Sequence, residues 1–236
     1  MSNGECIQKY NIQELEFITN RSYGGDCFVL ETLLMLVMKQ QEAHDLAGKL
    51  VLKFGSAKAV FEARYEVLIR FEGINDSVAT LLRLVPLLMR RYCMDQCDVT
   101  ATTFDCMKKM ADYCIARYIG TTDEALSILI MDKNYKFLGF EIVQTGSLSR
   151  AAVNEERIAE LLIAHNAKYF ILAHNHPSGD LSPSIDDITT THDLHRMFKY
   201  VGIQMVDHFI IYGKRYVPIL EKSLAYANGA DDWESY

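Results

Sequence analysis

The chain has 236 residues, half of them hydrophobic, and a formal net charge of −7. This length allows one large domain or two small ones with a substantial core, and the acidic balance opposes a strong nucleic-acid binder, which normally shows a basic patch. The apolar runs are far shorter than the roughly 20 residues that cross a bilayer, so we expect no transmembrane helix.

Residues 1–97 are predicted to form an all-helical domain. The first residues lack the basic segment and apolar stretch of a secretory signal, so we expect a cytoplasmic protein that does not associate with membranes. From residue 31 to about 92, apolar residues recur at helical spacing. Short joints such as "KFGSA" and "FEGIND" separate the predicted helices.

A tight turn at Gly73, Ile74 and Asn75 allows two interpretations. In helix-hairpin-helix modules such a turn exposes backbone N–H groups to a DNA phosphate. Here Asp76 follows where an anion would approach. We therefore favour plain helix packing and keep direct DNA contact as the alternative.

Residues 98–236 are predicted to form the second domain. A mixed helical connection at residues 93–121 leads into it and contains four cysteines. The chain has six cysteines at uneven spacing, and a cytoplasmic protein of this size needs no disulfides. We expect reduced thiols in the core or at interfaces. The alternative is a zinc site, which would use Cys93, Cys97, Cys106 and Cys114.

The period of the apolar pattern changes after residue 121. Residues 124–132 and 136–146 are rich in β-branched and apolar residues, with "KNY" as the turn of a hairpin. A helix at 154–167, capped by Asn154, a buried strand "KYFILAH" and a helix ending at Gly202 follow. Two more strands, in "MVDHFIIYG" and "RYVPIL", complete the order β-β-α-β-α-β-β, which predicts a mixed α/β layer.

The stretch "LAHNHPSGDLSPSIDD" carries the chemistry of the chain. His174 and His176 are two apart at the end of a strand, so their side chains share one face and can share a metal. Asp187 falls in the first turn of the next helix, which begins beside that strand end. Three such ligands leave a fourth tetrahedral position for water, as in catalytic zinc sites.

A purely structural role is the alternative for part of this stretch. Ser184 and Asp187 resemble a helix-capping pair, and an aspartate near a helix start is stabilised by the helix dipole without any metal. Capping does not explain two histidines at the end of an otherwise apolar strand. The residues themselves therefore favour a metal site.

His-x-His, seven residues and then Ser-x-x-Asp resembles the signature of the JAMM metallopeptidases of the JAB/MPN fold. "AHNHPSG" followed by "PSxxD" is similar to the RadC-like branch, and the likeness extends over residues 120 to 215. The N-terminal helical unit is similar, more loosely, to the domain that precedes it in RadC proteins, with a degenerate helix-hairpin-helix. The resemblance implies a helical domain followed by a mixed-sheet JAB/MPN domain.

The resemblance also implies roles for individual residues. His174, His176 and Asp187 would be ligands of one zinc ion, and Ser184 would donate a hydrogen bond to the developing oxyanion. The family needs an upstream glutamate at the start of the first strand, and Glu124 stands there. This chain departs from the branch pattern at residues 155–157 and 217–223, which leaves the ligand set intact.

Hydrolysis of a peptide or isopeptide bond is the function that this resemblance implies. Glu124 would take a proton from the attacking water and pass it to the leaving amine. Asp207 and His208 in "VDHFIIYG" also match the family pattern, as a support of the site or as a strand-entry pair bonded to backbone. The alternatives are a DNA-associated repair or recombination factor and a docking module without catalysis; the peptide or protein substrate stays open.

Overall fold

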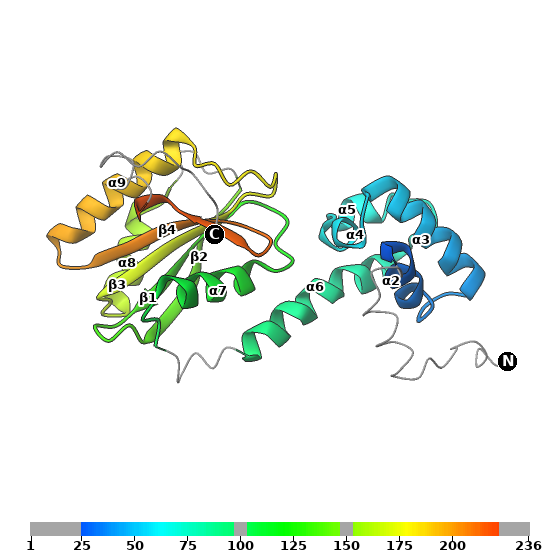
Figure 1. The fold of residues 1–236 in the computed structure, drawn as a ribbon, viewed down its shortest axis with the longest axis horizontal. Coiled ribbons are helices and arrows are strands. Elements are labelled where there is room, and N and C mark those ends of the chain that lie inside the picture. The colour runs from blue at the N-terminus through cyan, green and yellow to red at the C-terminus, as the bar shows by residue number, and fades with distance from the viewer. Residues whose placement is uncertain (1–24, 97–102, 147–152, 222–236) are drawn as a thin grey trace. The chain divides into compact units, whose positions relative to one another are not determined.

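The computed structural model describes residues 25–96, 103–146 and 153–221 of the chain. The chain divides into two compact units, Met1–Leu88 and Met89–Tyr236, which Figure 1 shows. The division falls inside helix α6. The sequence places the domain boundary after residue 97, a position outside the described residues.

The first unit is helical, as predicted. Its apolar face is clearest in α3, where Ala43, Leu46, Ala47 and Leu50 recur at i, i+3, i+4 and i+7 and are all buried. Gly55 ends this helix in the left-handed conformation and donates its N–H to the Val51 carbonyl at 2.8 Å. The described helices are α2 (Gly25–Leu34), α3 (Gln40–Phe54), α4 (Ala57–Glu62), α5 (Tyr65–Leu68) and α6 (Asp76–Gln96).

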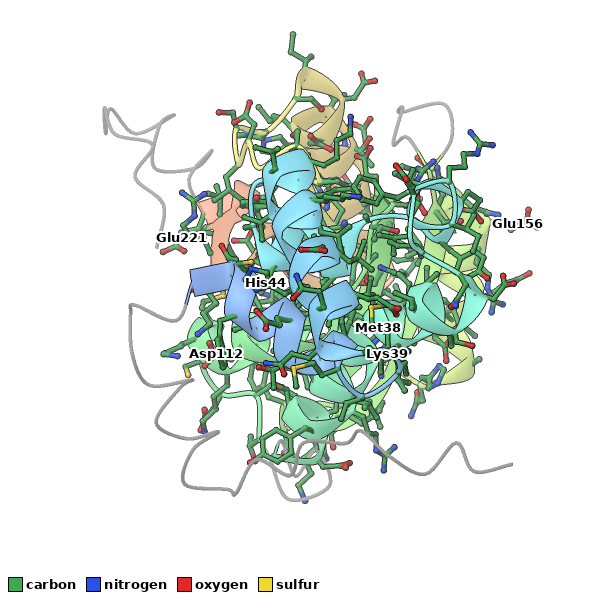
Figure 2. The ribbon with its side chains drawn as sticks, turned by 90° about the vertical axis from the view of Figure 1, so that its right-hand side faces the viewer. Met38, Lys39, His44, Asp112, Glu156 and Glu221 are labelled. Carbon is green, nitrogen blue, oxygen red and sulfur yellow. The ribbon has the colours of Figure 1, made fainter. Side chains whose placement is uncertain are left out.

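His44 lies on the exposed side of α3. Its side chain is 61% exposed, and its Nδ1 atom lies 2.9 Å from Glu31 Oε2 on α2 (Figure 2). This histidine is therefore a surface residue.

The turn before α6 is used within the helical unit. Gly73 has φ +91°, and Ile74 is packed into the helical core. The Asn75 side chain accepts the Val78 N–H at 3.0 Å and so caps α6. One of the N–H groups that a helix-hairpin-helix would offer to phosphate is thus occupied, and the helix-hairpin-helix detail of the prediction is not confirmed.

The second unit contains a five-stranded mixed sheet with the strand order β2-β1-β3-β4-β5. The predicted hairpin is confirmed, since β1 and β2 pair antiparallel, and the β3–β4 pair is parallel. The elements are α7 (Met107–Tyr118), β1 (Ala125–Met131), β2 (Phe137–Thr145), α8 (Glu155–Ala164), β3 (Tyr169–Asn175), α9 (Ile185–Tyr200), β4 (Gln204–Tyr212) and β5 (Arg215–Pro218).

Helices cover both faces of this sheet (Figure 1). Alternate residues of β1 point to opposite sides, so Leu129 packs with α7 and its neighbour Ile128 packs with α8 and α9. On β3, Phe170 and Leu172 also face α8 and α9. His174 follows them in the same alternation and therefore lies on the α9 side of the sheet.

Helix α8 begins as predicted. The Asn154 side chain accepts the Arg157 N–H at 2.8 Å and caps the helix. Glu155, Glu156 and Arg157, which depart from the branch pattern, are all exposed, and Glu156 is labelled in Figure 2. These three residues therefore belong to the surface of this unit.

Within the described ranges, no helix combines the length and the apolar character that a membrane span requires.

Candidate metal centre

The end of strand β3 presents two imidazoles side by side. His174 pairs with Leu126 of β1 and Ile210 of β4, and its side chain is fully buried. One more backbone hydrogen bond to β4 forms beyond the end of β3, since the His176 N–H donates to the Ile211 carbonyl at 3.0 Å. The Nε2 atoms of the two histidines lie 2.9 Å apart.

The loop after His176 turns sharply and holds this imidazole from its other side. Gly179 has φ +89°, and a Cβ there would lie 3.1 Å from the Tyr212 ring, so the turn requires glycine. The Asp180 carboxylate accepts the Ser182 N–H at 2.9 Å and shapes the loop. The His176 Nδ1 atom lies 2.6 Å from the Asp180 carbonyl oxygen.

Helix α9 begins with a reciprocal capping box. The Ser184 hydroxyl accepts the Asp187 N–H at 3.1 Å, and Asp187 Oδ2 accepts the Ser184 N–H at 2.8 Å. The same Oδ2 atom accepts the Ser184 hydroxyl hydrogen at 2.6 Å. Asp187 Oδ1 lies 3.4 Å from His174 Nε2, and Oδ2 lies 3.9 Å from His176 Nε2.

Glu124 completes the group at the start of β1. One ligand atom each from Glu124, His174 and His176 can be chosen so that all lie within 4.8 Å of one another. The Asn175 side chain binds the backbone on both sides of Glu124, accepting the Ala125 N–H at 2.9 Å and donating to the Asp123 carbonyl at 3.0 Å. Asn175 therefore fixes the glutamate backbone beside the histidines.

Behind His174 lies another buried histidine from the parallel neighbour strand. His174 Nδ1 is 2.8 Å from His208 Nε2, and His208 Nδ1 is 2.7 Å from the Thr191 hydroxyl. The adjacent Asp207 carboxylate instead accepts the backbone N–H groups of His208, Leu220 and Glu221. His208 thus contacts the candidate site, whereas Asp207 binds the backbone.

Burial decides the charge of these groups. It lowers the pKa of His174 to about 4, although the nearby Asp187 carboxylate acts in the opposite direction. Burial also lowers the pKa of His208 well below its ordinary value, and it raises the pKa of Asp207 to about 6. At neutral pH the two buried imidazoles are therefore uncharged, which is the form that binds metal.

The donor set fits a zinc ion. Tetrahedral zinc with ligand bonds of ~2.0–2.2 Å separates its ligand atoms by about 3.3 Å. The two Nε2 atoms are 2.9 Å apart, and Asp187 Oδ1 lies 3.4 Å from His174 Nε2, while the 3.9 Å contact with His176 Nε2 is made by the other oxygen, Oδ2. Because a carbonyl oxygen only accepts, the Asp180 contact requires a hydrogen on His176 Nδ1. The Nε2 atom of His176 faces Nε2 of His174, and a cation bound between them would accept a lone pair from each nitrogen.

All five predicted site residues lie together here. Among the described residues, the groups that could hold a metal include no cysteine, and Cys97 of the alternative cysteine site lies outside those residues. Sequence reasoning missed Thr191 and did not connect Asn175 with the glutamate. The signal for Thr191 is its spacing, since it follows Asp187 by one helical turn.

Comparisons with known proteins identify the family of this chain. A model of the "RadC-like JAB domain" family matches residues 104–224. A UPF0758 protein of Cupriavidus necator is 31% identical over 190 residues, which cover 80% of this chain and 83% of that protein. A UPF0758 protein of Acinetobacter baumannii is 32% identical over 187 residues, 79% of this chain and 80% of its own length. This chain therefore belongs to the family of RadC-like JAB proteins.

Proposed function

We propose that the chain is a zinc-dependent metallopeptidase that hydrolyses peptide or isopeptide bonds. The observation that carries the proposal is the convergence of two Nε2 atoms, 2.9 Å apart, with the Asp187 carboxylate beside a glutamate. Asp187 Oδ1 lies 3.4 Å from His174 Nε2, and Oδ2 lies 3.9 Å from His176 Nε2. His174, His176 and Asp187 would hold the ion. Zinc bound there would supply a Lewis acid that polarises a carbonyl and lowers the pKa of water towards ~7.

Glu124 would be the general base. Its backbone is held by Asn175 through the two flanking residues, and its carboxylate is half-buried beside the imidazoles. A carboxylate in this position can accept a proton from water and then donate it to the leaving amine. This one residue thereby carries both proton transfers of amide hydrolysis.

Ser184 would act on the carbonyl oxygen of the substrate. Its hydroxyl hydrogen now points to Asp187 Oδ2, and its oxygen accepts the Asp187 N–H. Rotation of the hydroxyl hydrogen to an oxyanion would keep the second of these bonds. Such a donor is typically worth about 10² to 10³ in rate.

Metal content and cleavage test this function separately. Purified protein saturated with zinc and desalted should retain about one zinc per chain, because the ligands are preorganised. The double variant His174→Ala, His176→Ala should retain none. Less than about 0.2 zinc per chain in the wild-type protein would reject the metal site.

Cleavage is measured on a mixed peptide library, one half of it containing lysine isopeptide bonds, with mass spectrometry of the new termini. Glu124→Gln is the matched control, since the amide keeps the shape of the glutamate and cannot accept the proton. The wild-type protein should generate termini that Glu124→Gln and chelator-treated protein do not. Bound zinc with identical termini from wild type and Glu124→Gln would favour the docking alternative.

A further inference from the structure

A continuous hydrogen-bonded chain runs from the candidate metal centre back to one of its own ligands. It passes from His174 Nδ1 to His208 Nε2 at 2.8 Å and from His208 Nδ1 to the Thr191 hydroxyl at 2.7 Å. The hydroxyl then donates to the Asp187 carbonyl oxygen at 2.6 Å. His174 and Thr191 are fully buried and His208 is 2% exposed, so water does not compete with these bonds.

The chemistry of the far end determines where each proton lies. The Asp187 carbonyl only accepts, so the single hydroxyl hydrogen of Thr191 points to it. The Thr191 oxygen must then accept from His208 Nδ1–H. A neutral His208 has its lone pair on Nε2, and that lone pair accepts from His174 Nδ1–H.

We propose that His208 and Thr191 are positioning residues that keep the proton of His174 on Nδ1, so that Nε2 is the unprotonated atom presented to the metal. For the identity of the ion this inference rests on the proposed function. A ligand histidine that donates its second ring N–H has a fixed tautomer and ring orientation. Here the hydrogen-bond chain begins at Asp187, so the residue that offers a carboxylate also sets the tautomer of its fellow ligand.

Without the Thr191 oxygen, nothing determines in which direction the hydrogen bonds between His174 and His208 run. His208 Nδ1–H would lose its acceptor, and the buried ring would favour the tautomer with hydrogen on Nε2. That hydrogen would face His174 Nδ1 and move the His174 proton to Nε2, where it blocks metal. Loss of such outer partners typically weakens metal affinity about 10- to 100-fold.

Nitrogen NMR of the imidazoles tests the proton positions directly. In metal-free protein labelled with ¹⁵N-histidine at pH 7.5, two-bond and three-bond ¹H–¹⁵N correlations distinguish the tautomers. His174 and His208 should both be protonated on Nδ1 alone. A proton on Nε2 of either ring would overturn the proposal, whether or not the protein binds zinc or cleaves any bond.

Matched variants test the effect on metal binding. Zinc affinity is measured by competition with a chromophoric chelator, and Co²⁺ absorption reports the ligand field. Thr191→Val removes the acceptor oxygen at nearly constant shape and should weaken zinc about 10- to 100-fold. Thr191→Ser keeps the oxygen and should stay within about 3-fold of wild type. Equal affinities for Thr191→Val and Thr191→Ser would overturn the proposal.

His208 is tested in the same way. In the variant His208→Gln, the introduced amide oxygen can still accept from His174 Nδ1–H, whereas the side chain in His208→Leu cannot. The first variant should therefore retain more zinc affinity than the second. The melting temperature of each variant is also measured without metal. It shows whether a loss of zinc affinity arises from a less stable fold or from a changed tautomer of His174. A zinc deficit that is equal in both variants and follows that melting temperature would contradict a positioning role.

Discussion

Asn175 illustrates how a residue between two ligands serves a different part of the site. Side chains alternate along β3, so Asn175 points away from the face of His174. Its amide reaches the backbone of Asp123 and Ala125, the two neighbours of Glu124. The order His-Asn-His therefore positions two ligands and the glutamate with three consecutive residues.

Asn175→Ala should destabilise the protein by about 1–3 kcal/mol, because it leaves the buried Ala125 N–H without an acceptor. Urea unfolding measures this loss, and faster hydrogen exchange at Ala125 locates it. Gln204→Ala is the matched control, since Gln204 is an exposed amide in the same sheet. A change within about 0.5 kcal/mol together with unchanged protection of Ala125 would refute the role given to Asn175.

Residues close in sequence were the easiest to predict. His174, His176 and Asp187 belong to one strand, turn and helix start, where the spacing determines the geometry. Glu124 is about fifty residues upstream, and its place depends on β1 pairing with β3. Periodicity does not specify strand partners, so only the family resemblance identified Glu124, and nothing identified Thr191 as a partner of His208.

Among the elements, strand β4 is held to the segment that follows β5 by the buried carboxylate of Asp207. Asp207 accepts the Leu220 N–H at 2.8 Å and the Glu221 N–H at 3.0 Å, and it also accepts the N–H of His208. It thereby holds the C-terminal turn against the strand that carries His208. The free energy of unfolding therefore depends on whether Asp207 is protonated.

The pH dependence of Asp207 has a definite sign. Burial raises the pKa to about 6 from 3.8, so between these values the folded protein keeps a proton that the unfolded chain releases. The stabilisation is complete below about pH 3.8 and is lost as the pH rises through about 6. It amounts to ~3 kcal/mol at most, at about 1.4 kcal/mol per pKa unit.

Asp207→Asn removes this titration. The difference in unfolding free energy between wild type and Asp207→Asn should favour wild type most at about pH 4 and shrink as the pH rises to about 6.5. Urea unfolding at several pH values measures it. A difference that is constant, or that grows with pH, would show that the carboxyl group is ionised in the folded state.

Element boundaries were well predicted where a side chain caps the backbone. Asn154 begins α8 and Ser184 begins α9, and both were visible in the sequence as capping residues. The sequence did not specify the strand order or the parallel β3–β4 pair. Those depend on how α9 crosses over the sheet, which is set by tertiary packing.

At the scale of the whole molecule, the residues of the candidate metal centre all belong to the second unit, Met89–Tyr236. Zinc that binds only the folded site should stabilise this unit by about 2.7 kcal/mol at one hundred times the dissociation constant. For about 150 residues this raises the melting temperature by roughly 5–10 °C.

Differential scanning calorimetry with zinc and with chelator measures that shift. The transition of the helical unit should not move, because the candidate ligands all lie outside it. His174→Ala, His176→Ala provides the control without ligands. An equal shift in this double variant would mean that zinc binds elsewhere on the chain.

The parallel pairing of β3 with β4 also bears on the order in which the chain folds. All five residues proposed to hold the ion or to act beside it precede α9 or lie in its first turn, whereas His208 comes from β4, thirty-four residues after His174. During synthesis the ligands therefore leave the ribosome before the strand that orients one of them. Non-local pairings of this kind form slowly. We expect high metal affinity to arise only when β4 inserts beside β3, so that a partly synthesised chain carries every ligand and still binds zinc weakly.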